Sequence, residues 1–436
     1  MVDNIIQVKK SVIRGTIRCP SSKSYSHRAI VIGSLTNGNS VIRNVLLARD
    51  TLATLNACKS LGAKIKHENG DLQIEGKARL DTPENVINVE NSGTTLRLVS
   101  AISSLVRKGF TVITGDESLR KRPMQPILDA LIQLGVKSYS TKMNGFAPLI
   151  VKGGGIRGGI ATVDGTVSSQ FVSALLISCI YADSNVTIKI NGDQVSKPYI
   201  ESTLATMKKF GVTIDHEPNY SEFHIENMEY TPTVFKIPGD FSTAALLLSA
   251  GVLAGDRLTV QGLNFKLPQG DSRIIDIIRM MGGKINVDKE KGEVVVSSNC
   301  EVLEGGNFDL TDNPDLLPVV SILALKARSQ VRVSGIAHAR LKESDRVANI
   351  CSELAKLGAV IKQQNNEILI SPPKILRNAS FESFNDHRLF MAFTIASMLT
   401  EKSRITGAES VDVSYPNFIE DMRKLNAVIS SMPNKQ

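Results

Sequence analysis

A short pattern recurs six times along this chain and constrains its fold more than any other feature. In each copy an apolar residue precedes glycine, or asparagine in the last copy, at the end of a stretch with helical character. The copies are Leu61-Gly62-Ala63, Leu134-Gly135-Val136, Phe210-Gly211-Val212, Met281-Gly282-Gly283, Leu357-Gly358-Ala359 and Leu425-Asn426-Ala427. Their glycines and Asn426 follow one another at spacings of 73, 76, 71, 76 and 68 residues, by subtraction. Such regular repetition indicates a fold built from one repeated unit.

The content of each unit follows from its local patterns. Glycine and asparagine tolerate the left-handed backbone that often follows a helix end, so each copy predicts a helix C-cap that leads into a strand. Alternating segments such as 71–75 and 293–296 predict a partner strand. Stretches rich in Ala, Ser and Leu, such as 171–180 and 244–253, predict a further helix upstream. We therefore expect an α/β (α+β) fold in which each unit reads strand, polar loop, helix, strand, helix and hairpin strand.

Six units divide naturally into three plus three. The middle of the chain, around Lys236-Ile237-Pro238-Gly239, separates the third unit from the fourth without a Gly/Ser-rich or Pro-rich linker. We therefore expect two packed lobes joined by short strands, with a ligand in the cleft between them.

The charge balance points to an anionic partner. Lys and Arg number 51 against 43 Asp and Glu, which gives a formal charge of +8 and a pI near 9.1. Nucleic acid, or a small phosphate or carboxylate, would suit this balance. The longest apolar runs, 171–182 and 244–254, are shorter than the roughly 18 residues of a membrane span. No basic region followed by an apolar core opens the sequence, so we expect a cytoplasmic protein without membrane contact.

The sequence gives no sign of a metal or a nucleotide cofactor. Its cysteines lie far apart and are expected to be small buried apolar residues; they are Cys19, Cys58, Cys179, Cys300 and Cys351. No HExxH occurs, and no GxGxxG follows a strand. The glycine-rich stretch 152–159 lacks the GK[ST] ending of a P-loop and is more typical of a turn between strands. We therefore expect no metal site and no cofactor.

Unusual polar residues gather in the loop that opens the first helix of each unit. These loops are 20–28, 91–97, 168–170, 239–242, 312–315 and 385–388. Any one of them is more simply interpreted as an N-cap, worth ~1 kcal/mol. Repeat symmetry, however, places equivalent loops at equivalent ends of the elements, where helix N-termini suit phosphate and carboxylate. The loops also carry cations that capping does not need, which are Lys23, Arg28, Arg97 and Arg388.

Two further cationic stretches, 120–123 and 341–346, lie outside these loops. Arginines bind carboxylate and phosphate in a bidentate manner, and Asp315 or Glu343 could exchange protons. The mixture fits an enzyme that handles two small anions. The adjacent Lys342 and Glu343 could equally form a surface pair of little energetic worth.

At these loops the sequence resembles the EPSP synthase family of enolpyruvyl transferases. The matching motifs occur in the family's order over nearly the full length, and they are highly specific as a set. They are Ser22-Lys23-Ser24 with Arg28, Asn91-Ser92-Gly93-Thr94 with Arg97, Arg122-Pro123, Asp164-Gly165-Thr166-Val167-Ser168-Ser169-Gln170-Phe171, Val195-Ser196-Lys197-Pro198-Tyr199, Lys342-Glu343-Ser344-Asp345-Arg346 and Asn385-Asp386-His387-Arg388.

The resemblance implies a two-lobed fold in which each lobe contains three βαβαββ units about a pseudo-threefold axis. It also implies that the N-terminal segment pairs into the C-terminal lobe. Lobe I is then 1–18 with 238–436, and lobe II is 19–237. The implied enzyme is a monomer without a cofactor.

The implied reaction transfers the enolpyruvyl group of phosphoenolpyruvate to the 5-hydroxyl of shikimate 3-phosphate by addition and elimination, and releases phosphate. By resemblance, the residues on shikimate 3-phosphate are Ser24, Arg28, Ser168, Ser169, Gln170, Ser196 and Tyr199. Those on phosphoenolpyruvate are Lys23, Gly93, Arg122, Arg346 and Arg388, and His387 is a further substrate-binding residue. Asp315 is expected to take the hydroxyl proton beside Lys342, Glu343 to protonate the methylene carbon, and Lys23 to assist catalysis.

Two alternatives remain open at this point. The sister transferase that acts on UDP-N-acetylglucosamine shares the fold but typically carries a cysteine before its Arg-Pro, whereas 115–122 contains none. A basic nucleic-acid-binding repeat protein is disfavoured because aromatic residues make up only 5% of the chain, tryptophan is absent, and no aromatic-interleaved basic stripe occurs.

One position departs from the family pattern. Many members have a lysine before a short Ser/Thr, aromatic, Pro motif, where this chain has Val413. Either the site works with one cation fewer, which we favour, or Lys402 or Arg404 supplies the charge.

Overall fold

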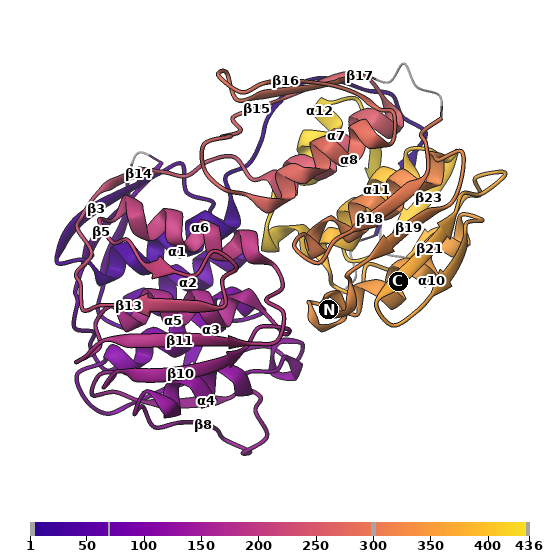
Figure 1. Ribbon diagram of the computed structural model, residues 1–436. Helices are drawn as coiled ribbons and strands as arrows, with labels where there is room; N and C mark the ends of the chain where they lie inside the picture. The colour runs from indigo at the N-terminus through magenta and orange to yellow at the C-terminus, as the bar shows by residue number, and fades with distance from the viewer. Residues whose placement is uncertain (1–4, 69, 298–301, 433–436) are drawn as a thin grey trace. The chain divides into compact units, whose positions relative to one another are not determined.

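The computed structural model describes residues 5–68, 70–297 and 302–432, and the chain in it forms two compact units. Unit 1 ends its first segment at Pro20 and resumes at Gly239, and unit 2 is Ser21–Pro238. The sequence had placed these two divisions after residues 18 and 237. Figure 1 colours the chain by residue number, so unit 2 runs from indigo to magenta. Each unit is described by itself below.

Unit 2 has three four-stranded sheets among its described residues, in the orders β14-β3-β5-β4, β6-β7-β9-β8 and β10-β11-β13-β12. Its strands are β3 (Gly38–Arg43), β4 (Lys64–Glu68), β5 (Asp71–Gly76), β6 (Ile87–Asn88), β7 (Phe110–Thr114), β8 (Ser138–Ser140), β9 (Leu149–Lys152), β10 (Gly159–Asp164), β11 (Val186–Asn191), β12 (Asp215–His216), β13 (Glu222–Ile225) and β14 (Val234–Lys236). Its α-helices are α1 (Lys23–Leu35), α2 (Arg49–Ser60), α3 (Gly93–Ile102), α4 (Gln125–Gln133), α5 (Ser169–Cys179) and α6 (Lys197–Lys209), with short 3₁₀ helices η1 (Ser103–Leu105) and η2 (Leu119–Lys121). In Figure 1, β10, β11 and β13 lie side by side as one layer.

Unit 1 has three further sheets among its described residues, in the orders β16-β17-β15-β2, β18-β19-β21-β20 and β22-β23-β1-β24. Its strands are β1 (Ile6–Lys9), β2 (Ile13–Arg18), β15 (Gly255–Gln261), β16 (Lys284–Asp288), β17 (Glu293–Ser297), β18 (Gly306–Asp309), β19 (Val331–Ser334), β20 (Val360–Gln363), β21 (Glu367–Ser371), β22 (Ser380–Phe381), β23 (Lys402–Ile405) and β24 (Val428–Ser431). Its α-helices are α7 (Phe241–Ala254), α8 (Ile274–Met280), α9 (Leu317–Leu323), α10 (Arg346–Lys356), α11 (His387–Ser397) and α12 (Phe418–Lys424), with 3₁₀ helices η3 (Gly270–Arg273), η4 (Pro314–Leu316), η5 (Ala324–Lys326), η6 (Ala337–Leu341) and η7 (Ala408–Val413).

The six sheets repeat one topology, which confirms the repeated unit predicted from the sequence. In β10-β11-β13-β12, for example, β10 and β11 are parallel and the hairpin strands are antiparallel. Three strands complete sheets that are distant in sequence. Strand β14 pairs in parallel with β3, β2 pairs in parallel with β15, and β1 pairs antiparallel with both β23 and β24. The N-terminal segment therefore pairs into the C-terminal part of the chain, as the resemblance implied.

Helix ends in both units carry the predicted left-handed caps. The residue after the pattern's apolar residue has a positive φ in every copy, at Gly62, Gly135, Gly211, Gly282, Gly358 and Asn426. These residues follow α2, α4, α6, α8, α10 and α12. A residue without a β-carbon, or asparagine, adopts this conformation at little cost, which explains the choice of residue in each copy.

The core of each unit surrounds its central helices. Helix α7 has no charged residue, and all its residues from Phe241 to Leu253 are buried. Helix α5 is similarly apolar and buried from Phe171 to Cys179. A helix that is apolar on all sides must be enclosed by protein, so these helices lie inside while the more amphipathic ones, such as α10, lie outside. Helix α3 packs on α5, and α11 packs on α7 and α9.

Three of the four described cysteines and the glycine-rich stretch follow the predictions, whereas Cys351 was wrongly expected to be buried. Cys19, Cys58 and Cys179 are buried, Cys351 is partly exposed, and Cys300 lies outside the described residues. The glycine-rich stretch connects β9 to β10. Among the described residues, no helix combines the length and the apolar character needed to cross a bilayer.

Candidate functional sites in the two units

Five of the six predicted polar loops cap the central helices, whereas the loop 312–315 leads into η4 without a side-chain cap. In unit 2 the side chains of Ser22, Ser92 and Ser168 accept hydrogen bonds from backbone N–H groups in the first turns of α1, α3 and α5. In unit 1, Asp240 and Asp386 cap α7 and α11 in the same way. Capping and site formation are therefore not alternatives here, because the same loops that cap the helices also hold the charged groups described next.

Lys23 makes a buried ion pair in unit 2. Its Nζ lies 2.8 Å from Oδ2 of Asp50, and their side chains are only 15% and 7% exposed. His27 packs beside them, with Nδ1 2.6 Å from Oγ1 of Thr54. Burial, followed by the charges of Lys23 and Arg28, holds the pKa of His27 well below its usual value. His27 is therefore neutral near pH 7, and Lys23 carries the charge next to Asp50.

Arg28 is buried, at 2% exposure, and its guanidinium is bound by protein atoms. Each of its three nitrogens donates to protein atoms: Nε to Oγ1 of Thr203 (2.7 Å), Nη1 to the carbonyl of Ser24 (3.0 Å), and Nη2 to the carbonyl of Tyr199 (2.9 Å) and to Oγ of Ser173 (3.4 Å). Burial lowers its pKa to about 10, so it stays charged at neutral pH. Arg28 thus joins α1 to α5 and α6 and positions Ser24 and Tyr199.

Two arginines lie over the N-terminus of α3. Arg122 Nη2 donates to Oδ1 of Asn91 (2.8 Å), and Arg97 Nη1 donates to Oε1 of Gln170 (2.9 Å). A β-carbon at Gly93 would lie 2.7 Å from Nη1 of each arginine. Glycine therefore allows two guanidinium groups to approach the helix N-terminus, which itself favours anions.

The remaining predicted residues of unit 2 lie at the starts of α5 and α6. Ser169 and Ser196 are buried, while Ser168, Gln170 and Tyr199 are partly exposed. Ser196 has φ of +57° at the N-cap of α6. A serine held in the left-handed region is strained by about 1–3 kcal/mol, and such strain is commonly found at functional positions.

Arg346 is the centre of a charged cluster in unit 1. Its Nε and Nη2 donate to the two oxygens of Asp386 at 2.8 and 3.2 Å. Its Nη1 donates to Oδ1 of Asp315 at 2.7 Å, and Nη2 donates to Oε2 of Glu343 at 2.6 Å. Three carboxylates therefore share one arginine that is only 1% exposed.

Asp315 also contacts the other cations of this cluster. Arg388 Nη2 lies 3.0 Å from its Oδ2, and Lys342 Nζ lies 3.9 Å from its Oδ1. Burial alone would raise the pKa of Asp315, but Arg388, Lys342 and Arg346 together hold it well below its usual value. Burial lowers the pKa of Lys342, against the attraction of Asp315. His387, buried at the start of α11, precedes Arg388.

A further buried carboxylate belongs to this cluster. Asp271, at 3% exposure, contacts Oγ of Ser242 through its Oδ2. Burial and the negative charge of Asp315 raise the pKa of Asp271 to about 6, although Arg388 opposes the shift. Near this group, burial and Lys342 lower the pKa of His338 to about 4.

Three acidic residues of these sites were missed from the sequence. Asp386 lay inside a recognised motif and could have been identified there. Asp50 and Asp271 carry no motif, and a lone aspartate near a helix start is usually a cap or a surface residue.

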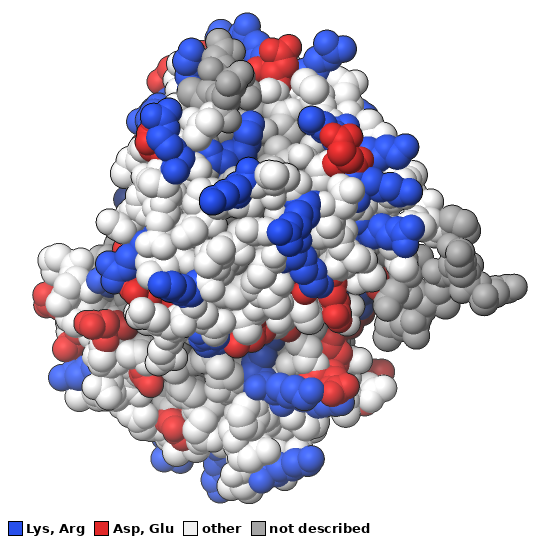
Figure 2. All heavy atoms as spheres, turned by 90° about the vertical axis from the view of Figure 1, so that its right-hand side faces the viewer, with Lys and Arg blue, Asp and Glu red and all other residues white. Residues whose placement is uncertain are grey.

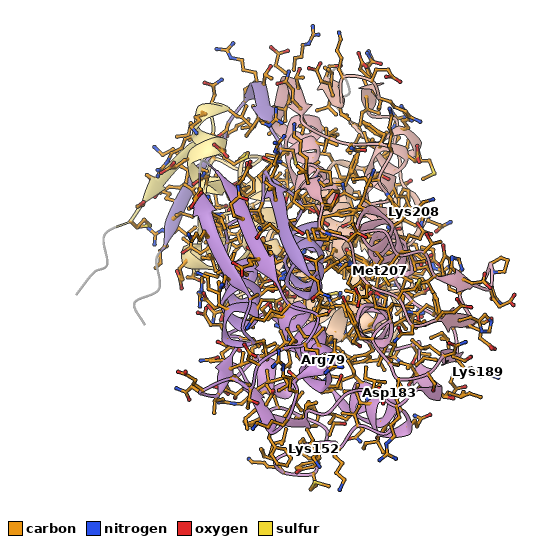
Figure 3. The ribbon with its side chains drawn as sticks, turned by 90° about the vertical axis from the view of Figure 1, so that its left-hand side faces the viewer. Arg79, Lys152, Asp183, Lys189, Met207 and Lys208 are labelled. Atoms are coloured by element: carbon orange, nitrogen blue, oxygen red, sulfur yellow. The ribbon has the colours of Figure 1, made fainter. Side chains whose placement is uncertain are left out.

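A hollow of about 460 Å³ lies elsewhere in unit 2, and no residue around it was predicted to be functional. Its lining includes Arg79, Arg107, Asp183 and Glu229 from loops, together with the residues that follow η1 and α5. Figure 3 labels Arg79 and Asp183, which belong to this lining. The hollow is at the C-terminal ends of α3 and α5, whereas the predicted residues gather at their N-terminal ends.

Neither a metal cluster nor a basic stripe is found in the parts of the molecule considered next, which are the described residues and the face drawn in Figure 2. Within residues 5–68, 70–297 and 302–432, no three His, Cys, Asp or Glu side chains are grouped to hold a metal ion. On the face drawn in Figure 2, Lys and Arg side chains are scattered among acidic and uncharged ones. That face offers no continuous basic stripe of the kind that tracks a nucleic acid.

The sequence and the fold both match those of known proteins. A family model described as EPSP synthase (3-phosphoshikimate 1-carboxyvinyltransferase) matches residues 8–422. A curated relative from Nitrosopumilus maritimus (strain SCM1), named 3-phosphoshikimate 1-carboxyvinyltransferase, is 45% identical over 423 residues, which are 97% of this chain and 99% of the relative. A relative of the same name from Methanocaldococcus jannaschii is 39% identical and covers 98% of this chain and 99% of its own length.

Solved structures show the same fold. The EPSP synthase from Acinetobacter baumannii superposes with a TM-score of 0.81 at 25% identity and covers 99% of this chain and 100% of its own. The enolpyruvyl transferase NikO from Streptomyces tendae has a TM-score of 0.80 at 15% identity, over 99% and 100% of the two chains. The second likeness concerns the fold alone.

Proposed function

The chain belongs to the EPSP synthase family, and from this premise we propose which of its residues bind the substrates and which move protons. The reaction transfers the enolpyruvyl group of phosphoenolpyruvate to the 5-hydroxyl of shikimate 3-phosphate in the shikimate pathway and releases phosphate. Both substrates are small anions, which agrees with the positive balance of the chain.

In this proposal, shikimate 3-phosphate binds at the starts of α1, α5 and α6 in unit 2. The contributing residues are Ser24, Ser168, Ser169, Gln170, Ser196 and Tyr199. Hydroxyl, amide and backbone N–H donors at helix N-termini suit a phosphate ester, which supports the assignment. Arg28 takes part through its bonds to the carbonyls of Ser24 and Tyr199.

Phosphoenolpyruvate carries a carboxylate and a phosphate, and we assign four cations to it. Lys23 and Arg122 act with the α3 N-terminus at Gly93, and Arg346 and Arg388 act from unit 1, where His387 is adjacent. In the structure, Arg346 and Arg388 donate to the carboxylates of Asp315, Glu343 and Asp386. Those carboxylates occupy donors that an incoming anion would use, so substrate binding requires an exchange of partners.

Asp315 and Glu343 perform the proton transfers in this mechanism. Asp315 accepts the 5-hydroxyl proton as the hydroxyl oxygen attacks the carbon that bears the phosphate, while Glu343 protonates the neighbouring methylene carbon. In the second step the carbon–oxygen bond to phosphate breaks, Asp315 passes its proton to the departing phosphate, and the methyl group returns a proton to Glu343 as the double bond forms again. An anion that binds Arg388 and Arg346 would draw them from Asp315, which raises the pKa of Asp315 and makes it a better base.

One observation carries the assignment most directly: Asp315 and Glu343 are both hydrogen-bonded to the same buried arginine. Because both side chains reach one guanidinium, they lie close together before the substrates bind, as a base for the hydroxyl proton and an acid for the methylene carbon require.

The test is a phosphate-release assay with both substrates, followed by mass measurement of the product. We expect release only when phosphoenolpyruvate and shikimate 3-phosphate are both present, with one enolpyruvyl group added to the latter. Release that needs UDP-N-acetylglucosamine instead would support the sister transferase. Salt-sensitive retention of nucleic acid in a filter assay, without phosphate release, would support the binding protein.

The assembly and location of the enzyme are further proposals. We expect a monomer that acts in the cytoplasm and binds neither nucleic acid nor membrane. Light scattering after gel filtration should give a mass near 47.3 kDa. A mass near twice that value would contradict the monomer.

A further inference from the structure

The three carboxylates on Arg346 differ in how firmly the protein holds them. The side chains of Asp315 and Glu343 are 12% and 14% exposed, whereas that of Asp386 is 0% exposed. Asp386 is also hydrogen-bonded to the backbone and to a loop residue. The backbone N–H of Arg388 donates to its Oδ1 at 3.0 Å, and Oγ of Ser344 donates to its Oδ2 at 3.2 Å.

Asp386 and the other two carboxylates also use different edges of the guanidinium. Asp386 takes the edge formed by Nε and Nη2 in a bidentate pair. Asp315 binds Nη1, and Glu343 binds Nη2. An anion can therefore replace the two partly exposed carboxylates while the buried pair with Asp386 stays intact.

From this arrangement we propose that Asp386 is the positioning residue for phosphoenolpyruvate in unit 1: it fixes the plane of Arg346 and the start of the helix that carries Arg388. The inference rests on the proposed function, which assigns those two arginines to this substrate. Without a fixed partner, a flexible arginine would lose rotamer freedom on binding, and that entropy opposes affinity. A buried bidentate carboxylate removes this freedom in advance.

The position of Ser344 extends the same role to the loop before α10. Because Ser344 donates to Asp386, the carboxylate also restrains the loop in which Lys342 and Glu343 lie. Hydrogen bonds of Asp386 thus link the loop that carries Glu343, the guanidinium of Arg346 and the N-terminus of α11. Asp386 is not itself one of the groups assigned to the substrate.

The test uses Asp386→Asn, since asparagine is a good N-cap of nearly the same shape but lacks the charge. We expect the KM for phosphoenolpyruvate to rise about tenfold or more, while the dissociation constant for shikimate 3-phosphate changes less than about twofold. Shikimate 3-phosphate binding is measured by calorimetry on the full chain without phosphoenolpyruvate.

Glu353→Gln is the matched control for loss of a buried carboxylate in the same unit. Glu353 is 3% exposed and accepts from Lys356 and from the backbone of Glu382, but it contacts none of the proposed substrate residues. We expect this variant to lower the melting temperature without raising the KM for phosphoenolpyruvate. If both variants raise that KM in proportion to their loss of stability, Asp386 is merely structural.

A double-mutant cycle with Arg346→Lys separates positioning from an independent effect. Lysine lacks the planar fork, so Asp386→Asn should cost much less affinity in that background than in the wild type. If the two substitutions lower the affinity for phosphoenolpyruvate additively, the proposal is wrong. Unchanged phosphoenolpyruvate affinity in Arg346→Lys itself, with wild-type activity established, would instead refute the assignment of Arg346 to this substrate.

Discussion

At the scale of single residues, the two units differ in how their cations are balanced. Among the described residues of unit 2, Lys23, Arg28, Arg97 and Arg122 are accompanied by one buried carboxylate, that of Asp50. In unit 1, Lys342, Arg346 and Arg388 contact the carboxylates of Asp315, Glu343 and Asp386. Unit 2 therefore offers a surplus of positive charge, whereas in unit 1 an anion must compete with carboxylates already bound.

The carboxylates of unit 1 give the first prediction. Asp315→Ala and Glu343→Gln should each lower kcat by about 10²–10⁴, the usual contribution of general acid–base catalysis, with smaller effects on substrate affinity. Steady-state kinetics with both substrates varied will measure this split. Turnover near that of the wild type in either variant would remove that residue from its role.

Asp271 gives a prediction about pH and stability. Burial and Asp315 raise its pKa to about 6, above the 3.8 of an unperturbed aspartate, so the folded protein favours the protonated form. The stability from this preference is present below about pH 4 and is lost as the pH rises through 6. Asparagine cannot ionise, so the free energy of unfolding of Asp271→Asn should rise relative to that of the wild type as the pH is raised from 5 to 8. The expected rise is on the order of 1–3 kcal/mol.

Thermal unfolding at pH 5 and pH 8 measures the stability of Asp271→Asn against that of the wild type. Asp309→Asn is the control variant. The backbone N–H of Thr311 lowers the pKa of Asp309, so removing that charge should destabilise the protein more at pH 8 than at low pH. A difference between Asp271→Asn and the wild type that does not vary with pH would contradict the shifted pKa.

At the scale of elements, the helix N-termini explain why the sequence predicted where polar and charged side chains gather. Serine or aspartate caps, left-handed glycines and alternating strands all act over a few residues, so local patterns identified them. Asp50 was not predictable, because its pairing with Lys23 depends on how α1 and α2 pack. Arg28 was assigned to the substrate, yet its donors meet Thr203, Ser173 and two backbone carbonyls, which only the packed helices bring within reach.

The N-terminus of α3 gives a prediction at this scale. Gly93→Ala places a methyl group only 2.7 Å from Nη1 of Arg97 and from Nη1 of Arg122, so both guanidinium groups must move. Because Gly93 has an ordinary helical backbone, the loss of stability should be small. We expect the KM for phosphoenolpyruvate to rise about tenfold while the melting temperature changes little. An unchanged KM would show that these arginines are not placed by the glycine.

Strand β23 contains Lys402 and Arg404, the two candidates for the cation that is absent at Val413. Lys402 and Arg404 are exposed, and they alternate with the buried Ser403 and Ile405, so they face away from the core of unit 1. Val413 itself is 7% exposed. This placement favours a site that works with one cation fewer. Lys402→Ala and Arg404→Ala should leave the KM for phosphoenolpyruvate within about twofold, and Val413→Lys should lower it. A large rise for either alanine variant would identify a substitute cation.

At the scale of the whole molecule, three strands bind together parts of the chain that lie far apart in sequence. Strand β14 completes the sheet of the first repeat, β2 completes that of the fourth, and β1 completes that of the sixth. Periodicity predicted the repeats but not the exchange of β2 and β14, because strand pairing between distant segments leaves no local signal. The family resemblance supplied part of this information by implying that the N-terminal segment joins the C-terminal sheets.

The central claim is that the arginines assigned to phosphoenolpyruvate, Arg122 and Arg388 among them, bind this substrate. The most direct measurement is calorimetric binding of an inert phosphoenolpyruvate analogue to the enzyme saturated with shikimate 3-phosphate, in Arg122→Ala and Arg388→Ala. Each variant removes a guanidinium that can make charge-assisted bonds, so each should weaken binding by about tenfold or more. If either variant binds the analogue as tightly as the wild type, that arginine does not hold this substrate and the account is contradicted.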